Sequence, residues 1–92
     1  MIIYDTPTVS VNHDTERSLI FIKWSGFTIK DTFRKAVDIT LDYMLTENLS
    51  IMLCDIIEQR IVSPAEQTYA KDKVLEFYRK TGSFKCAFLA KD

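Results

Sequence analysis

Acidic side chains near the middle of the chain are the first candidates for chemistry. Asp55 follows the apolar run Ile51 to Cys54, and Glu58 comes shortly after it. If the run is a parallel strand, Asp55 lies at its carboxyl end, where ligand sites of α/β sheets gather. A metal site or an acid/base pair would need a second fixed carboxylate or a histidine at a recognisable spacing, and the only histidine, His13, lies in a segment expected to be a solvated turn. We therefore expect no catalytic residue, no metal, no cofactor and no enzymatic activity.

Ser63 is the second candidate, because it stands where a helix is expected to begin. It precedes Pro64 and is followed by Glu66, the pattern of a hydroxyl N-cap with proline at the first helical position. A phosphate on Ser63 would be tolerated there by the backbone amides. A plain N-cap, worth about 1 kcal/mol, is the favoured interpretation. The candidate regulatory or partner-binding surface consists of Asp55, Glu58, Gln59, Arg60, Ser63 and Gln67.

Composition bounds the class of protein. The 92 residues suffice for one domain, and 47% hydrophobic residues suffice for a modest core. Twelve basic and thirteen acidic residues give a net charge of −1, which provides no field to attract nucleic acid. No apolar run is long enough to span a membrane, and no signal peptide pattern is present, so we expect a cytoplasmic protein without membrane insertion. Cys54 and Cys86 lie in apolar runs and are interpreted as reduced core thiols.

Apolar periodicity predicts the order β-β-α-β-α-β. The expected elements are strands near 8–12, 19–24, 51–54 and 85–90, and helices from Thr28 to about Asn48 and from Ser63 to Gly82. The runs at 19–24 and 51–54 are almost wholly apolar, which is typical of strands covered on both faces. Residues 1–6 are expected to form either a short edge strand or a docked arm. The fold class is therefore α/β, a mixed four-stranded sheet packed against two amphipathic helices.

The helix faces follow from the spacing of apolar residues. The predicted buried stripe of the first helix is Ile29, Phe33, Ala36, Val37, Leu41 and Met44. That of the second helix is Ala70, Val74, Phe77 and Tyr78. Tyr69 and Leu75 fall beside this second stripe, so they indicate either a wider buried face or a contact surface. With only Gly26 and Gly82 in the chain, a glycine-rich phosphate loop is excluded.

The order of elements resembles that of the STAS-like fold, the fold of anti-sigma factor antagonists and of small bacterial STAS-like proteins. The resemblance rests on Trp24-Ser25-Gly26, on Asp55 and on Ile61-Val62-Ser63-Pro64-Ala65, and it extends from about Val9 to Ala90. Signalling members carry an Asp-Ser pair whose serine is phosphorylated. Spacing from Asp55 places Ser63 at the aspartate and Pro64 at the serine, so this register lacks the switch residue. A register slipped by one residue would place Ser63 at the serine, but Pro64 marks the start of the helix and disfavours the slip. Signalling members also continue with a further helix, so residues 1–92 are expected to be a single domain that is minimal or C-terminally truncated.

The resemblance implies a non-enzymatic protein-interaction or regulatory module. The alternative is a domain that binds a small ligand, a lipid or a nucleotide, between the sheet and the helices, where Leu75 and Tyr69 would suit a pocket. We also expect a homodimer, because a short sheet leaves an edge or a helix face uncovered. The sequence does not identify the protein partner.

Overall fold

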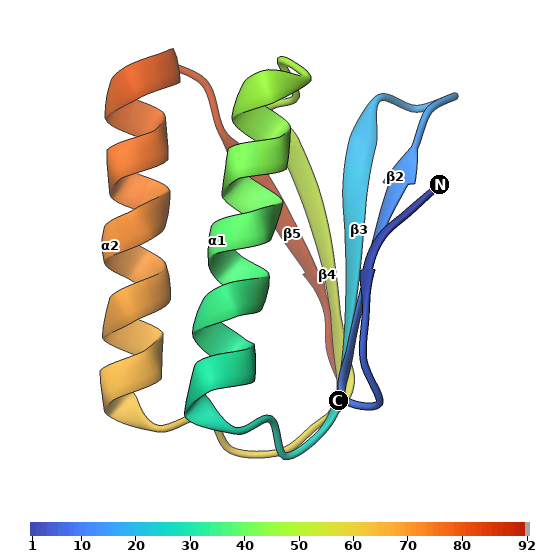
Figure 1. The fold of residues 1–92 in the computed structure, drawn as a ribbon, viewed down its shortest axis with the longest axis vertical. Coiled ribbons are helices and arrows are strands. Elements are labelled where there is room, and N and C mark those ends of the chain that lie inside the picture. Colours follow the sequence, from blue (N-terminus) through green and yellow to red (C-terminus); the bar gives the residue numbers. More distant parts are fainter. Residues whose placement is uncertain (92) are drawn as a thin grey trace.

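The computed structural model describes residues 1–91 and shows one five-stranded mixed sheet with two helices (Figure 1). In chain order the elements are β1 (Ile2–Asp5), β2 (Val9–Asp14), β3 (Leu19–Gly26), α1 (Lys30–Thr46), β4 (Ile51–Gln59), α2 (Pro64–Thr81) and β5 (Lys85–Leu89). The strands lie in the order β1-β2-β3-β4-β5 across the sheet. β1, β2 and β3 pair antiparallel, whereas β3, β4 and β5 pair parallel. The predicted α/β class is confirmed.

The predicted count of four strands is wrong, because Ile2–Asp5 forms a fifth strand at one edge of the sheet. The N-terminus holds this strand in place. The Met1 amino group donates a 2.8 Å hydrogen bond to Asn12 Oδ1, and the His13 amide donates a 2.8 Å bond to the Met1 carbonyl. Ile3 and Tyr4 also pack against the core. Of the two alternatives for residues 1–6, the edge strand is therefore the one observed.

Both helices cover the same face of the sheet (Figure 1). α1 connects β3 to β4 and α2 connects β4 to β5, so the two crossovers step across the sheet in one direction. Right-handed crossovers that step in one direction place their helices on one face. The expectation that the strands at 19–24 and 51–54 are covered on both faces is therefore wrong. On the other face Phe21 and Leu53 are only half-buried, and Ile51 is exposed.

The core lies between this face and α1. Its fully buried members include Val9 and Val11 of β2, Ile20 of β3 and Met44 of α1. The predicted stripe of α1 is confirmed except at Ile29, which is 60% exposed because it lies before the first helical residue. α2 contributes much less, and Phe77 is its only buried apolar residue.

The helix ends test the capping predictions. α2 begins and ends as predicted, with Ser63 as N-cap and Gly82 as C-cap at φ 71°. Asn48 also has the positive φ, 58°, expected of a residue just after a helix. The predicted start of α1 at Thr28, interpreted from the sequence as its cap, is wrong, because the N-cap is Ile29 and Thr28 lies outside the helix. The Thr28 hydroxyl is buried and has no hydrogen-bond partner in the described chain.

Two strands run further than predicted. β4 does not end at Asp55 but continues to Gln59, because it pairs with β3 as far as Gly26. β2 includes His13, whose Nδ1 lies 2.7 Å from the Tyr43 hydroxyl, so His13 is half-buried rather than solvated. Neither helix of the described chain is long and apolar enough to cross a membrane.

Candidate functional site

A cavity of about 730 Å³ lies between the helices and the β3–β5 part of the sheet. Its wall is mostly apolar. The lining residues are Ile22, Trp24, Phe33, Val37, Thr40, Leu41, Met52, Cys54, Ile56, Gln59, Arg60, Val62, Gln67, Ala70, Lys71, Val74, Leu75, Phe84, Cys86 and Phe88. A largely apolar cavity of this size falls within the range of pockets that bind small molecules.

The cavity exists because α2 packs against α1 and leaves the β5 side of the sheet open. Every residue of β5 is exposed, and Phe88, on the cavity wall, is 62% exposed. Ala70 and Val74 of the predicted α2 stripe face the cavity and are half-buried, whereas Tyr78 is exposed and the prediction of its burial is wrong. Leu75 lines the cavity as the pocket alternative expected. Apolar side chains such as Leu75 and Phe88, which could be buried in a core, therefore remain accessible to solvent.

Tyr69, the other residue beside the stripe, points elsewhere. Its hydroxyl donates hydrogen bonds of 2.7 and 2.9 Å to the two carboxylate oxygens of Asp38. The hydrogen bond to Asp38 raises the pKa of Tyr69, and burial of the hydroxyl raises it further. Tyr69 thus joins α2 to α1 and is not among the residues that line the cavity.

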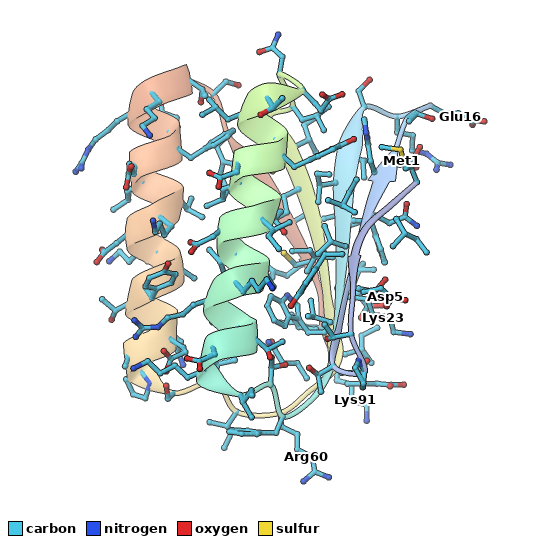
Figure 2. The ribbon with its side chains drawn as sticks, viewed as in Figure 1. Met1, Asp5, Glu16, Lys23, Arg60 and Lys91 are labelled. Atoms are coloured by element: carbon cyan, nitrogen blue, oxygen red, sulfur yellow. The ribbon has the colours of Figure 1, made fainter. Side chains whose placement is uncertain are left out.

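The charged groups of the cavity wall come from the loop after β4 and from α2. Arg60 follows the last residue of β4, and Lys71 and Gln67 belong to the N-terminal half of α2. The Arg60 amide donates a 2.9 Å bond to the Gly26 carbonyl, which fixes the loop, and Figure 2 shows its side chain extending into solvent from there. Gln67 Nε2 donates a 2.7 Å bond to the Val62 carbonyl. No carboxylate is among the residues that line this cavity.

One polar side chain inside the cavity wall has no partner. Thr40 of α1 is completely buried, and its hydroxyl has no hydrogen bond within the described chain. The helical residues Thr46 and Thr81 behave differently, because each donates a 3.0 Å bond to the carbonyl four residues before it. A buried hydroxyl without a partner costs about 1–3 kcal/mol. Thr40 is therefore an unpaired polar group buried in the cavity wall.

Two thiols also line the cavity. Cys54 is buried on β4, and Cys86 on β5 is exposed, so the prediction that both are core thiols holds only for Cys54. Both are free, as expected. The hydrogen bond between them raises the pKa of Cys54, and burial raises it further. The same hydrogen bond lowers the pKa of Cys86.

The structure separates the six residues predicted to form a surface. Gln59, Arg60 and Gln67 come together on the cavity wall. Ser63 borders a second pocket of about 100 Å³, which Gln59 and Arg60 also line. Glu58 is exposed and lies outside both linings.

Asp55 lies on the opposite face of the sheet. Its neighbours Cys54 and Ile56 line the cavity, and successive side chains of a strand point to opposite faces. Its register partner Lys23 is on the side of the sheet away from the helices (Figure 2). Asp55 Oδ1 accepts a 3.1 Å bond from the Ile57 amide. The prediction that Asp55 ends its strand is therefore wrong, and Asp55 lies apart from the candidate residues on the cavity wall.

Sequence reasoning missed an ion pair that fixes the start of α2. Arg34 Nε lies 2.7 Å from Glu66 Oε1, and Glu66 is nearly buried. The Ser63 hydroxyl, and then Arg34, hold the pKa of the Glu66 carboxyl below its usual value of 4.5. The capping box predicted the Ser63 contact, but nothing in the spacing of Arg34 and Glu66 along the chain indicates that they meet.

No family model matches the chain, and no curated protein matches it. The resemblance to the STAS-like fold thus remains a prediction from the sequence. Within residues 1–91 no three His, Cys, Asp or Glu side chains form a group that could hold a metal ion. The described residues can enclose part of an apolar molecule and offer it the cationic groups of Arg60 and Lys71 and the amide of Gln67.

Proposed function

We propose that this domain binds a small molecule with a largely apolar body in the cavity between the helices and the β3–β5 part of the sheet. The observation that carries the proposal is the cavity of about 730 Å³, with Phe88 and Leu75 of its wall 62% and 41% exposed. Apolar surface gains about 25 cal/mol for each Å² removed from water. A bound apolar molecule would cover these side chains and stabilise the folded domain.

Of the two ligand types expected from the sequence, a lipid fits this wall better than a nucleotide. A nucleotide needs donors and acceptors for its base, its ribose and its phosphates. The interior of the cavity offers chiefly aromatic and aliphatic side chains, with Thr40 as the uncharged polar group on α1. The proposed activity is binding, without a catalytic step.

A protein-interaction module of the STAS-like kind is the second candidate, and one residue favours it. Ile61, in the loop between β4 and α2, is 89% exposed. Its neighbour Arg60 extends into solvent from the same loop (Figure 2). An exposed aliphatic side chain beside a cation is a suitable contact for another protein. This loop also borders the cavity, so an occupied cavity and a partner would meet at the same edge.

A homodimer is part of this second proposal. The outer face of the sheet carries Phe21, Leu53 and Ile51, which the helices do not cover. Light scattering at high micromolar concentration is expected to give twice the mass of the chain. A monomer mass under those conditions would contradict the dimer but would leave the cavity proposal intact.

Native mass spectrometry tests the cavity proposal. Ala70 lies on the wall and Ala65 lies outside it, both on α2, so Ala70→Trp should narrow the cavity and Ala65→Trp should not. We expect the wild type and Ala65→Trp to retain a small molecule or to bind added dodecan-1-ol, and Ala70→Trp to bind dodecan-1-ol more weakly than either. Circular dichroism checks that all three proteins are folded. Equal uptake by all three, or uptake by none, would contradict the proposal.

A further inference from the structure

Building on the proposed function, we infer that the ligand is an amphipathic anion. Its negatively charged head lies beside Lys71 at the mouth of the cavity, where the exposed Arg60 side chain would turn toward it, and its apolar body extends along α2 toward Leu75 and Phe84. The shared chemistry is a carboxylate or phosphate head on an alkyl chain.

The charged residues of the cavity wall favour an anion. Apart from the two thiols, Arg60 and Lys71 are the ionisable residues on the cavity wall, and both are cations. Neither takes part in the ion pairs found within residues 1–91, whereas Lys73 and Lys80 on the same helix lie 3.8 and 3.2 Å from carboxylates. A solvated lysine needs no partner. Two cations and no carboxylate among the lining residues, however, give the mouth of the cavity a positive potential that favours an anion.

The polar and apolar parts of the wall are ordered along α2. Gln67 and Lys71 lie in its N-terminal half, and Leu75 lies further along the helix. From Gln67 to Leu75 the helix rises about 12 Å. Phe84 lines the cavity after the C-terminal end of α2. A linear molecule with one charged end would therefore bind with that end near Gln67 and Lys71 and its apolar end near Leu75 and Phe84.

The helix dipole acts in the same direction. α2 has 18 residues, and its N-terminus lies at the end where Arg60 and Gln59 line the wall. The N-terminal end of a helix favours negative charge. The dipole alone would not define a site. Together with the two cations it disfavours a cationic head at the mouth of the cavity.

The test compares head groups on one alkyl chain. Dodecanoate, dodecyl phosphate, dodecan-1-ol and dodecyltrimethylammonium are titrated below their micelle-forming concentrations. Trp24, the only tryptophan, lines the cavity and reports binding by its fluorescence. We expect one or both anions to bind tightest, the alcohol more weakly and the cation weakest. The relative affinities of dodecanoate and dodecyl phosphate distinguish a fatty-acid-like head from a phospholipid-like one.

Charge-removing variants locate the head. Arg60→Gln and Lys71→Gln should each weaken binding of the preferred anion by roughly three- to tenfold and leave dodecan-1-ol binding unchanged. Arg79→Gln is the matched control, because Arg79 is an exposed cation of α2 outside the cavity wall. Higher salt should weaken anion binding to the wild type.

The outcomes separate the two proposals. If dodecan-1-ol and the anions bind equally, and the two variants match the control, the cavity binds apolar molecules but the anionic head is refuted. If the cation binds tightest, the inference is also refuted. If none of the four binds and Trp24 fluorescence stays constant, both the cavity proposal and its extension fail.

Discussion

The Sγ atoms of Cys54 and Cys86 lie 3.9 Å apart on the cavity wall. Cys54 pairs with Phe88 and Cys86 with Met52, so the two cysteines are diagonal neighbours on adjacent parallel strands. The separation allows a thiol–thiol hydrogen bond and is well beyond the S–S bond of about 2.05 Å. One thiol is buried and the other exposed, so the pair has one reactive member.

Replacing Cys54 should make Cys86 less reactive. A hydrogen bond from the Cys54 thiol stabilises the Cys86 thiolate and lowers the Cys86 pKa. Cys54→Ala removes the donor, so alkylation of Cys86 by iodoacetamide near pH 8 should slow by about two- to fivefold. Cys54→Ser keeps a donor and serves as the control. A Cys54→Ala rate equal to or above that of the wild type would show that the hydrogen bond does not act on Cys86.

Ser63 should contribute to stability through two hydrogen bonds. Its Oγ accepts from the Glu66 amide at 3.3 Å and donates to Glu66 Oε2 at 2.6 Å. Ser63→Ala should lower the free energy of unfolding by about 1 kcal/mol. Ser83→Ala, at an exposed position after α2, should change it little. Urea unfolding at pH 7 measures both, and equal stability of the Ser63→Ala variant and the wild type would contradict the role of the cap.

The same geometry revises the expectation for Ser63→Asp. From the sequence alone aspartate is a neutral replacement, because it also caps helices. In the structure its carboxylate would face that of Glu66, so Ser63→Asp should be less stable than the wild type at pH 7. The Glu66 pKa is lowered in the folded state, so its contribution is complete above about 4.5 and is lost as the pH falls through the lower folded value. The deficit of Ser63→Asp should therefore shrink below pH 4.5.

Phe77 and Phe33 should differ in the cost of truncation. Both are buried, at 4% and 6% exposure. Phe77 packs edge-on against Phe84 with ring centroids 5.8 Å apart, and Phe33 packs against Trp24 at 5.0 Å, but Phe33 also borders the cavity. The cost of Phe→Ala in a core is about 3–5 kcal/mol, and we expect Phe33→Ala at the lower end of that range. Urea midpoints near that of the wild type for either variant would contradict these core assignments.

Thr40→Val should stabilise the ligand-free domain. Valine keeps the shape of threonine and removes the buried hydroxyl that has no partner. We expect a gain of about 1 kcal/mol in the free energy of unfolding. Thr46→Val is the control, because the Thr46 hydroxyl is exposed and bonded to the Asp42 carbonyl. A loss of stability in Thr40→Val would mean that the hydroxyl has a partner in solution.

Local signals predicted the elements of this fold well. Ser63, Pro64 and Gly82 bound α2 because each acts within its own turn of backbone. The burial of a residue that depends on contacts between distant elements could not be predicted from such local signals. Whether Ile51 and Leu53 are covered depends on both helices lying on one face. The apolar stripe of α2 resembles that of a core helix, and only its packing against α1 shows that Val74 faces a cavity.

The alkylation rate of Cys86 tests most directly whether the cavity between the helices and the β3–β5 part of the sheet binds a ligand. Because Cys86 lines the cavity, a bound molecule should shield it from iodoacetamide. A double variant with Cys86→Ala and Ala87→Cys moves the thiol to the other face of β5, where a ligand should give no protection. We predict that saturating dodecanoate slows alkylation of the wild type and leaves the double variant unaffected. Unchanged rates in both proteins, at concentrations that saturate any change in Trp24 fluorescence, would contradict the account.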